Sequence, residues 1–278
     1  MNRLLTLGYS PCPNDTFIFH ALVHGLVPTA GFTVQERLED VETLNRLGLA
    51  GVLDLTKVSC HALGHLRQHY ALLRSGGALG RGCGPLVIAR QPTSMAALRG
   101  RRIAIPGTLT TANLLLQLFG AGYETAVAMP FDQIMPALKS GAVDAGVIIH
   151  ESRFTYRDAG FHAVQDLGAW WEAETGLPIP LGAILARRDL GAATIVAVDA
   201  AIRASLEHAR AHPEATRAYI RAHAQELDDA VIDAHIALYV NDFSLDLGAD
   251  GVHAVATLLA RAEARGLIPQ CELPLFAA

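Results

Sequence analysis

Short apolar runs alternate with helix-type patterns along the first two thirds of the chain, and this alternation restricts the fold more than any other feature. Runs such as LLTLGY, VLDLTKVS, PLVIAR and RRIAIPG have the length and composition of strands, and helix-type patterns such as TFIFHALVHGLV and TTANLLLQLFGAG lie between them. Alternation of this kind indicates βαβ units. We therefore predict an α/β fold with mainly parallel sheets, followed from about residue 190 by a helix-rich last third.

Two segments share one pattern: a helix, a glycine, two residues, an aspartate and then an apolar strand. They are LNRLGLAGVLDLTKVSC and MPALKSGAVDAGVIIHE, which align Gly51 with Gly141 and Asp54 with Asp144. The shared positions are few, so the match supports two similar α/β lobes without proving them. Ligands bind outside the carboxyl ends of strands in open α/β sheets. The pattern therefore predicts that both strands end at one central cleft.

Two lobes require two crossings of the chain. The segment ARQPTSMAALRG marks the first change, and TGLPIPLGAILARRDL is typical of a return strand. We predict a discontinuous larger lobe of residues 1–88 and 178–278 and an inserted smaller lobe of residues 89–177. This is the arrangement of a bilobal binding-protein fold with a hinge.

Composition and charge exclude several classes of partner. The chain has 278 residues, 51% of them hydrophobic and 18% charged, so it can bury a large core. Its net charge of -5 provides no cationic field for nucleic acid or anionic lipid. The opening MNRLLTLGYSPCP lacks a secretory apolar region, and no run approaches a membrane span. We expect a soluble, cytoplasmic protein with no membrane partner, and the sequence leaves its oligomeric state open.

The cysteines favour reduced thiols. They show neither C-x-x-C spacing nor the density of a disulfide scaffold, which argues against disulfides and against a cysteine-based zinc site. They are Cys12, Cys60, Cys83 and Cys271.

His150 is the strongest single candidate for chemistry. It follows the apolar run GVII, so its side chain is expected at the carboxyl end of a strand, facing Lys57 and Ser59 from the opposite lobe. An imidazole titrates near neutral pH and can act as a general base. The chain has 12 histidines, and a single histidine is more often a surface or structural residue. Both interpretations stay open on these grounds.

Two loops lie between a strand and a helix. In GTLTTANLLLQLF the hydroxyls of Thr108, Thr110 and Thr111 precede the helix, where free N–H groups can hold an anion, although one threonine would suffice as a cap. In SPCPNDTF, Asn14 and Asp15 can cap the following helix or contact a ligand. The residues alone do not decide between these alternatives.

Three other motifs have plain structural interpretations. The five glycines of SGGALGRGCGPLVIAR do not match a P-loop and favour close backbone passage near the cleft. His61, His65 and His69 recur every four residues, and we favour a solvated or partly packed face over a metal site. Trp170 and Trp171 could wall a pocket, but core packing is the preferred interpretation.

Taken together, GYSPCPNDTFIFHALVHG, LEDVETLN, LTKVS, RSGGALGRGCGPLV, TTAN, IIHESRFTY, DLGAWWE and TGLPIPLGAILARRDL resemble the 1,4-dihydroxy-6-naphthoate synthase family. The resemblance covers nearly the whole chain in order, and its first block and HESRFTY are the most specific. It implies a two-lobed periplasmic-binding-protein-like type II fold with a central cleft. It also implies a carbon-carbon lyase of the futalosine route to menaquinone, without metal or organic cofactor, acting on cyclic dehypoxanthine futalosine.

The resemblance further implies roles for individual residues. The family's general base falls on His150. Its substrate contacts fall on one side chain of a helix, one strand end and the hydroxyl loop, namely Asn45, Lys57, Val58, Ser59, Thr110, Thr111 and Ala112. Which of these donors binds the substrate carboxylate and which an oxyanion stays open. So do the roles of Glu151 and Arg153, which either orient the base or pair with each other.

A different class of function shares the same fold features. A non-catalytic cytoplasmic protein that binds or senses a small molecule could have the same lobes and cleft, because fold does not fix function. The histidine expected in the cleft favours the enzyme.

Overall fold

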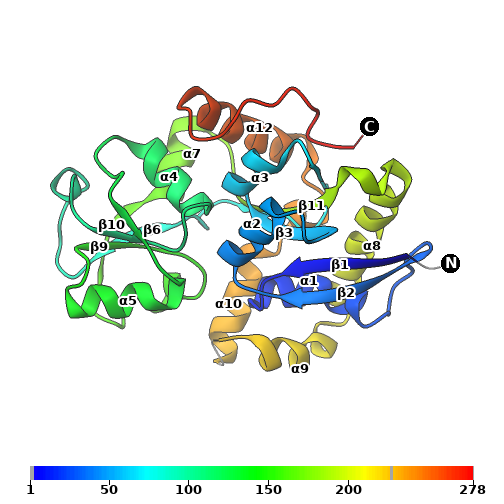
Figure 1. Ribbon diagram of the computed structural model, residues 1–278. Coiled ribbons are helices and arrows are strands. Elements are labelled where there is room, and N and C mark those ends of the chain that lie inside the picture. Colours follow the sequence, from blue (N-terminus) through cyan, green and yellow to red (C-terminus); the bar gives the residue numbers. More distant parts are fainter. Residues whose placement is uncertain (1–2, 226–227, 278) are drawn as a thin grey trace.

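The computed structural model describes residues 3–225 and 228–277, which form two β-sheets flanked by helices (Figure 1). Residues 1–2, 226–227 and 278, which fall in the predicted larger lobe, lie outside the described residues. None of the helices in the described ranges is both long and apolar enough to cross a membrane.

The first sheet has six strands in the order β2-β1-β3-β11-β4, with β5 paired to β11. Strand β1 pairs in parallel with β2 and β3, whereas β11 runs antiparallel to β3, β4 and β5. The strands are β1 Arg3–Tyr9, β2 Phe32–Leu38, β3 Leu55–Ser59, β4 Tyr70–Leu72, β5 Ala78–Gly80 and β11 Ile179–Arg187.

The second sheet has five strands in the order β10-β6-β9-β7-β8. Strand β7 pairs in parallel with β8 and β9, whereas β6 runs antiparallel to β9 and β10. The strands are β6 Leu86–Ala89, β7 Ile103–Ile105, β8 Ala126–Ala128, β9 Ala145–Ile148 and β10 His162–Asp166.

Most strands of each sheet run in one direction, as predicted, but one strand in each, β11 in the first and β6 in the second, runs opposite to the others. Strand β6 enters the second sheet with Leu86 opposite Ile148 at the carboxyl end of β9, and β11 meets β3 with Gly182 opposite Ser59. Each of these strands comes from the other sheet and starts at the edge where the parallel strands end. It must therefore run in the opposite direction, which hydrophobic periodicity does not reveal.

The chain crosses between the sheets twice. Strand β5 ends at Gly80 in the first sheet and β6 begins at Leu86 in the second, which puts β6 entirely beyond the first crossing although the predicted boundary at residues 88 and 89 divides it. The chain returns with β11 from Ile179. The lobe bounds as such stay a prediction.

Helices surround both sheets, and α8 to α12 make the last third helix-rich as predicted. Helix α1 packs against α8, α9 and α10, while α12 packs on α3 and β11. The α-helices are α1 Pro13–Val23, α2 Val41–Leu49, α3 Cys60–Leu66, α4 Thr111–Phe119, α5 Phe131–Ser140, α6 Ser152–Thr155, α7 Leu167–Thr175, α8 Ala192–Ala211, α9 Pro213–His223, α10 Asp229–Tyr239, α11 Asp242–Leu245 and α12 Gly248–Ala264. Short 3-10 helices span Ala96–Leu98 and Arg188–Leu190.

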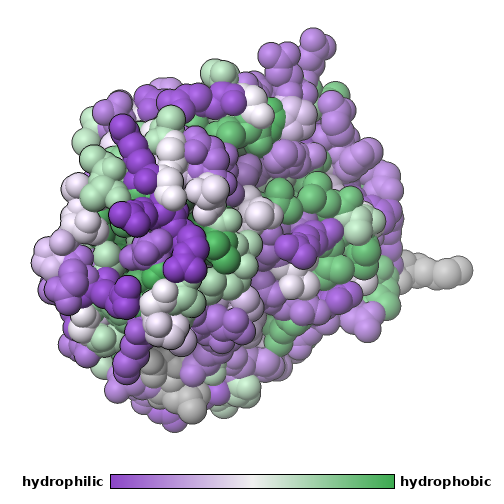
Figure 2. Space-filling view, turned by 60° about the vertical axis from the view of Figure 1, so that its left-hand side comes forward, coloured by the Kyte–Doolittle hydropathy of each residue, from purple (hydrophilic) through white to green (hydrophobic). Residues whose placement is uncertain are grey.

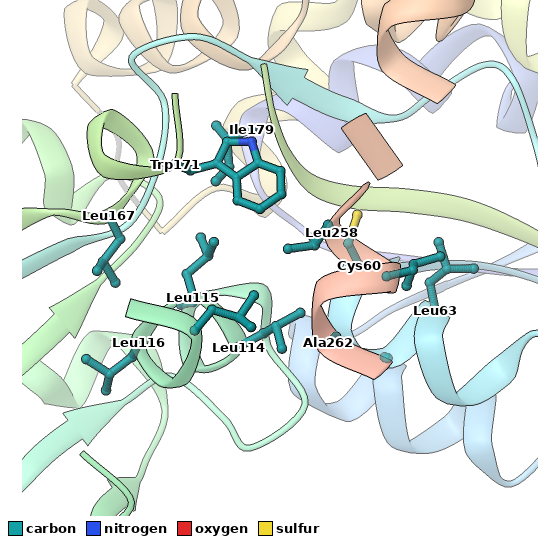
Figure 3. Packing of buried hydrophobic residues seen from close by; sticks show 14 of the residues in the cluster. Cys60, Leu63, Leu114, Leu115, Leu116, Leu167, Trp171, Ile179, Leu258 and Ala262 are labelled. Atoms are coloured by element: carbon teal, nitrogen blue, oxygen red, sulfur yellow. The ribbon is translucent and has the colours of Figure 1, made fainter. Parts of the chain in front are cut away.

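One hydrophobic cluster joins the two sheets. Leu114 and Leu115 of α4 lie near Trp171 of α7, and Leu63 of α3 and Leu258 of α12 continue the cluster from the first sheet (Figure 3). All five side chains are buried. By contrast, strongly hydrophilic residues gather on the end of the smaller lobe that faces the viewer in Figure 2. Burial of apolar surface in this cluster therefore holds the two lobes together where the chain connects them, and the hydrophilic outer end of the smaller lobe faces solvent.

The predicted repeat exists in the structure. Gly51 and Gly141 follow α2 and α5 with φ of 67° and 79°, the left-handed conformation in which glycine ends helices most readily. Asp54 Oδ2 then accepts a hydrogen bond from the backbone N–H of Thr6 at 2.9 Å, and Asp144 Oδ2 accepts one from that of Arg102 at 3.0 Å.

These two aspartate contacts are equivalent in the two lobes. Each carboxylate fastens the start of a strand to the neighbouring parallel strand or to the residue just before it. The repeated frame thus brings the carboxyl ends of β3 and β9 to corresponding positions.

The glycine-rich segment passes close to another backbone, as predicted. A Cβ atom added to Gly84 would lie 2.3 Å from the Cα atom of Gly168, and one added to Gly168 would lie 2.7 Å from the Cα atom of Gly84. Real Cβ atoms do not come so close to backbone atoms, so neither position accommodates a side chain without a shift of the chain. Glycine at both positions lets the segment that leads into β6 lie directly against the start of α7.

Candidate active site

A cavity between the two sheets collects the predicted site residues. It encloses about 680 Å³ of empty space, including the part that is open to solvent. Strand ends and helix starts from both lobes line it, and Tyr239 of α10 closes one side. The predicted residues among its lining are Lys57, Val58, Ser59, Thr110, Thr111, Ala112 and His150.

His150 lies two residues beyond the end of β9 in an unusual backbone conformation. Its φ is 54°, and no other non-glycine residue in the described parts of the chain has a positive φ. Such a conformation costs free energy and persists where the surroundings enforce it, often at functional sites. The imidazole is partly buried and contacts the rings of Phe131 and His235, with centroid distances of 5.1 Å and 6.1 Å.

The surroundings of His150 keep its imidazole neutral. Burial lowers the pKa of His150 below its usual value, and the nearby carboxylates of Glu151 and Asp15 oppose this effect without cancelling it. A neutral imidazole has a nitrogen lone pair that can accept a proton. The side chain is thus in the protonation state that a general base requires near neutral pH.

A buried ion pair forms one wall of the cavity. Lys57 Nζ lies 2.5 Å from Asp15 Oδ1 and also donates to the carbonyl of Gly76 at 3.3 Å. Asp15 Oδ2 accepts from the hydroxyl of Ser10 at 2.7 Å. Asp15 therefore anchors Lys57, and the SPCPNDTF loop contributes to the site itself as well as to the start of α1.

Asn45 differs from the other predicted contacts because it lies behind Ser59. Its Oδ1 accepts from the backbone N–H of Ser59 at 2.9 Å, and its Nδ2 donates to Ser59 Oγ at 3.3 Å. Asn45 is fully buried and does not line the cavity, whereas Ser59 does. Ser59 Oγ accepts this bond and donates to no acceptor among the described residues, so its own hydrogen is available to the cavity.

The hydroxyl loop uses its threonines for structure. Thr110 Oγ1 caps α4 by accepting from the backbone N–H of Asn113 at 3.3 Å and donates to the carbonyl of Gly107 at 2.8 Å. Thr111 Oγ1 donates to the carbonyl of Leu181 at 2.6 Å and accepts from the N–H of Cys60 at 2.9 Å. Both hydroxyl hydrogens are engaged. The groups left for a ligand are the N–H groups of Thr111 and Ala112 at the start of α4, which have no partner within the helix.

Glu42 makes contacts next to the site that the sequence did not predict. Its carboxylate reaches from α2 to the loop of the other lobe and accepts from Thr108 N at 3.0 Å, Thr108 Oγ1 at 3.1 Å and Leu109 N at 3.2 Å. The Glu42 carboxylate is therefore the anion that the N–H groups of Thr108 and Leu109 bind, so these two groups are not free for a ligand. The segment LEDVETLN carries Glu42, but no spacing rule connects it with a loop 66 residues away.

His235 was also missed, because it comes from the helix-rich last third. It is fully buried on α10, and its Nε2 lies 2.9 Å from Asn14 Oδ1. Asn14 Nδ2 donates to Asp15, so Asn14 Oδ1 is the acceptor and the proton of His235 is on Nε2. Burial holds the pKa of His235 well below its usual value, which keeps the ring neutral.

Arg153 and Glu151 do not pair with each other; each contacts a different residue. Arg153 Nη2 lies 2.8 Å from Asp166 Oδ2 and donates to the carbonyl of Gly82 at 2.8 Å, and Nη1 donates to that of Gly84. Arg153 thus ties the glycine-rich segment to β10 and does not pair with Glu151. The Glu151 carboxylate lies instead 3.8 Å from Nδ1 of His235.

The remaining motifs have structural positions. His61 is buried, His65 is partly buried and His69 is exposed beyond the end of α3, so they do not form one stripe on a helix. Trp171 is fully buried and donates from Nε1 to the carbonyl of Pro178 at 3.0 Å, which confirms the preference for core packing.

Comparison with known proteins identifies the family. A family model described as menaquinone biosynthesis matches residues 5–264. A 1,4-dihydroxy-6-naphthoate synthase of Thermus thermophilus is 58% identical over 272 residues, which cover 98% of each chain. One of Streptomyces coelicolor is 51% identical over 270 residues, which cover 95% of each chain. The chain belongs to the 1,4-dihydroxy-6-naphthoate synthase family. It is therefore an enzyme of menaquinone biosynthesis that acts on a small molecule.

Solved structures confirm the fold of this family member. A protein of Archaeoglobus fulgidus is 37% identical with a TM-score of 0.89, and the match covers 95% of this chain and 98% of that one. The alkanesulfonate-binding protein SsuA of Xanthomonas axonopodis pv. citri is 16% identical with a TM-score of 0.71, covering 96% and 94%. The latter likeness shows the fold alone. The predicted α/β, two-lobed periplasmic-binding-protein-like fold is thus confirmed.

The Lys57–Asp15 pair yields a prediction for stability. Asp15→Asn should lower the free energy of unfolding by about 3–5 kcal/mol, because it leaves the buried Lys57 ammonium without its counter-charge. Asp233→Asn removes the exposed partner of a partly exposed arginine, Arg217, and should change stability far less than Asp15→Asn. Urea unfolding of both variants measures the difference, and equal effects would contradict a special role for the buried pair.

Proposed function

We propose that this enzyme is a cofactor-independent carbon-carbon lyase that converts cyclic dehypoxanthine futalosine to 1,4-dihydroxy-6-naphthoate, with His150 as the general base. The observation that carries the proposal is the neutral His150 imidazole, held in a strained backbone at the strand end beside an enclosed cavity. The substrate's identity rests on the family resemblance and on the product in the relatives' names, and a cytoplasmic location rests on the resemblance alone.

The first step is removal of a proton from carbon. His150 takes the proton next to the substrate's ketone, and the electron pair moves onto the ketone oxygen. A developing oxyanion is stabilised most by donors that are already in place. Lys57 Nζ, anchored by Asp15, and the hydroxyl of Ser59, held by Asn45, are such donors on the opposite wall.

The substrate carboxylate requires a second set of donors. The N–H groups of Thr111 and Ala112 lie in the first turn of α4, where the helix dipole also favours negative charge, and both residues line the cavity. We assign the carboxylate to this helix start and the oxyanion to Lys57 and Ser59. This assignment separates the two charges across the cavity.

After proton removal the ring system opens and a small sugar-derived fragment leaves. Loss of that fragment lets the bicyclic product become aromatic, which makes the overall conversion favourable. No step needs an electron acceptor or a metal. As the electron pair returns from the oxygen, the departing group takes the electron pair of the bond that breaks, and it then receives the proton that His150 holds.

The contacts between the lobes would control access of water and release of product. Glu42 and Thr111 each bond from one lobe to the other, so the cavity stays enclosed while both contacts persist. Opening of the lobes would break them. In enzymes of this kind such opening often limits turnover.

We expect His150→Asn to lower kcat by at least about 10²-fold, because general-base catalysis contributes roughly that much or more. Asparagine tolerates positive φ, so the melting temperature should stay close to that of the wild type. His253→Asn replaces an exposed histidine of α12 and should leave kcat unchanged. Turnover of cyclic dehypoxanthine futalosine measures the effect. Binding of that compound without any product from the wild-type enzyme would favour the non-catalytic binding protein.

The pKa of His150 predicts the pH dependence. The base must be neutral, and burial lowers its pKa from the ordinary value of 6.5, so kcat/KM should fall only as the pH drops below 6.5. The fall occurs because protonation removes the lone pair. A pH profile of kcat/KM tests this. If kcat/KM already falls above pH 6.5 as the solution is acidified, and His150 variants show the same fall, another group is the base.

Asn45 should act through Ser59. Ser59→Ala should reduce transition-state stabilisation by about 1–3 kcal/mol, since it leaves a substrate oxygen without a donor. Asn45→Ala should give a smaller loss, and the double variant should resemble Ser59→Ala alone because the two residues share one interaction. Values of kcat/KM for the three variants provide the test. Additive losses would show that Asn45 acts independently of Ser59.

A further inference from the structure

Three side chains beside His150 form, together with it, a group that the proposed reaction does not use as a group. Cys12 Sγ, a ring nitrogen of His150 and a carboxylate oxygen of Glu151 all lie within 4.8 Å of one another. Within residues 3–225 and 228–277 this is the single cluster of three or more such donors. Cys12 precedes α1, while the other two follow β9, so their spacing in the sequence gave no sign of it.

His235, on a third element, lies next to Glu151 but is not within 4.8 Å of all three donors. Its Nε2 proton is engaged by Asn14, so Nδ1 carries the lone pair, and Nδ1 is fully buried without a hydrogen-bond partner in the described chain. Nδ1 lies 3.8 Å from Oε1 of Glu151. An unsatisfied buried acceptor is costly. A lone pair 3.8 Å from a carboxylate oxygen repels it, and a cation between the two atoms would turn this contact into an attraction.

The spacing of these donors suits a tetrahedral metal site. Zinc bonds of about 2.0–2.3 Å place neighbouring donors roughly 3.3–3.7 Å apart. The His235–Glu151 distance of 3.8 Å is close to this range. The donor atoms of Cys12, His150 and Glu151 lie within 4.8 Å of one another, so side-chain rotation is needed to bring the set to bonding distances. Thiolate, imidazole and carboxylate are also the ligands that zinc prefers.

We propose that Cys12, His150, Glu151 and His235 bind a soft divalent cation, Zn²⁺ above all, and that the bound cation inhibits the enzyme by occupying the lone pair of His150. The Cys12 thiol proton passes to solvent as the sulfur binds the metal, and no redox change is involved. One thiolate and one carboxylate balance the two positive charges, so the occupied site is neutral. Metal binding itself does not depend on the proposed reaction, whereas the inhibition rests on it.

A path to the site exists beside the substrate cavity. A second cavity of about 440 Å³ of empty space is bordered by Cys12, His150 and Glu151, with Phe131 and Gln225 at its other side. His150 also lines the substrate cavity, so it lies between the two. A cation can therefore reach the cluster from this side while substrate and cation compete for the same imidazole.

Titration of the metal-free enzyme with Co²⁺ tests the binding directly, because a cobalt–thiolate bond gives an intense near-ultraviolet charge-transfer band. We expect one Co²⁺ per chain, release of a proton, and displacement by Zn²⁺. Cys12→Ser should abolish the band, and Glu151→Gln, which keeps the size of the side chain, should weaken binding at least about tenfold. Cys271→Ser, which removes a partly exposed thiol elsewhere, should leave the band unchanged.

Absence of the band in the wild type, or its loss in Cys271→Ser and persistence in Cys12→Ser, would overturn the site. Turnover measurements then test inhibition: Zn²⁺ should raise KM for cyclic dehypoxanthine futalosine, and a chelator should restore the original rate. If the spectra appear but the metal-free enzyme produces no product, the proposed function fails and the metal site stands. If turnover is normal and no cobalt band forms, the metal site fails and the proposed function stands.

Discussion

The hydroxyl of Thr111 is the interaction on which the geometry of the site depends most. It donates to the carbonyl of Leu181 on β11 and accepts from the N–H of Cys60 at the start of α3, so one oxygen fastens the second lobe to two elements of the first. The hydrophobic cluster behind α4 supplies the packing, but packing alone does not fix a register (Figure 3). This bond does, and it sets the start of α4 opposite the end of β3 across the cavity.

Buried polar pairs then prepare each wall for its task. Asn45 orients Ser59, Asp15 holds Lys57, and Asn14 engages His235. Each partner satisfies a group that would be costly to bury alone, and in doing so it restricts the group to one orientation. A site built in this way needs little reorganisation when charge develops on the substrate, which is the main source of electrostatic catalysis. The same rigidity makes the site sensitive to loss of any one partner.

Features set by local sequence pattern could be predicted, whereas features set by long-range contacts could not. The alternation of strands and helices, the Gly-x-x-Asp repeat and the position of His150 after β9 are local features, and hydrophobic pattern and turn chemistry determine them. The antiparallel direction of β6 and β11, the place of Asn45 behind Ser59, and the reach of Glu42 to the loop before α4 depend on how the lobes meet. His235 on α10 is another such case, since nothing in a helical pattern says which buried residue faces a distant cleft.

The two copies of the repeat end differently, and this difference separates the two functions of the site. After β3 the chain turns directly into α3, with Ser59 as the residue before the helix, so that strand end presents hydrogen-bond donors. After β9 the chain passes through His150 at a φ of 54°, and only the four-residue α6 follows. The left-handed turn redirects the chain and places an imidazole where the other lobe has a helix start. In the proposed mechanism, the common frame supplies the base from one lobe and the oxyanion donors from the other, and the strain at His150 is the structural cost of that asymmetry.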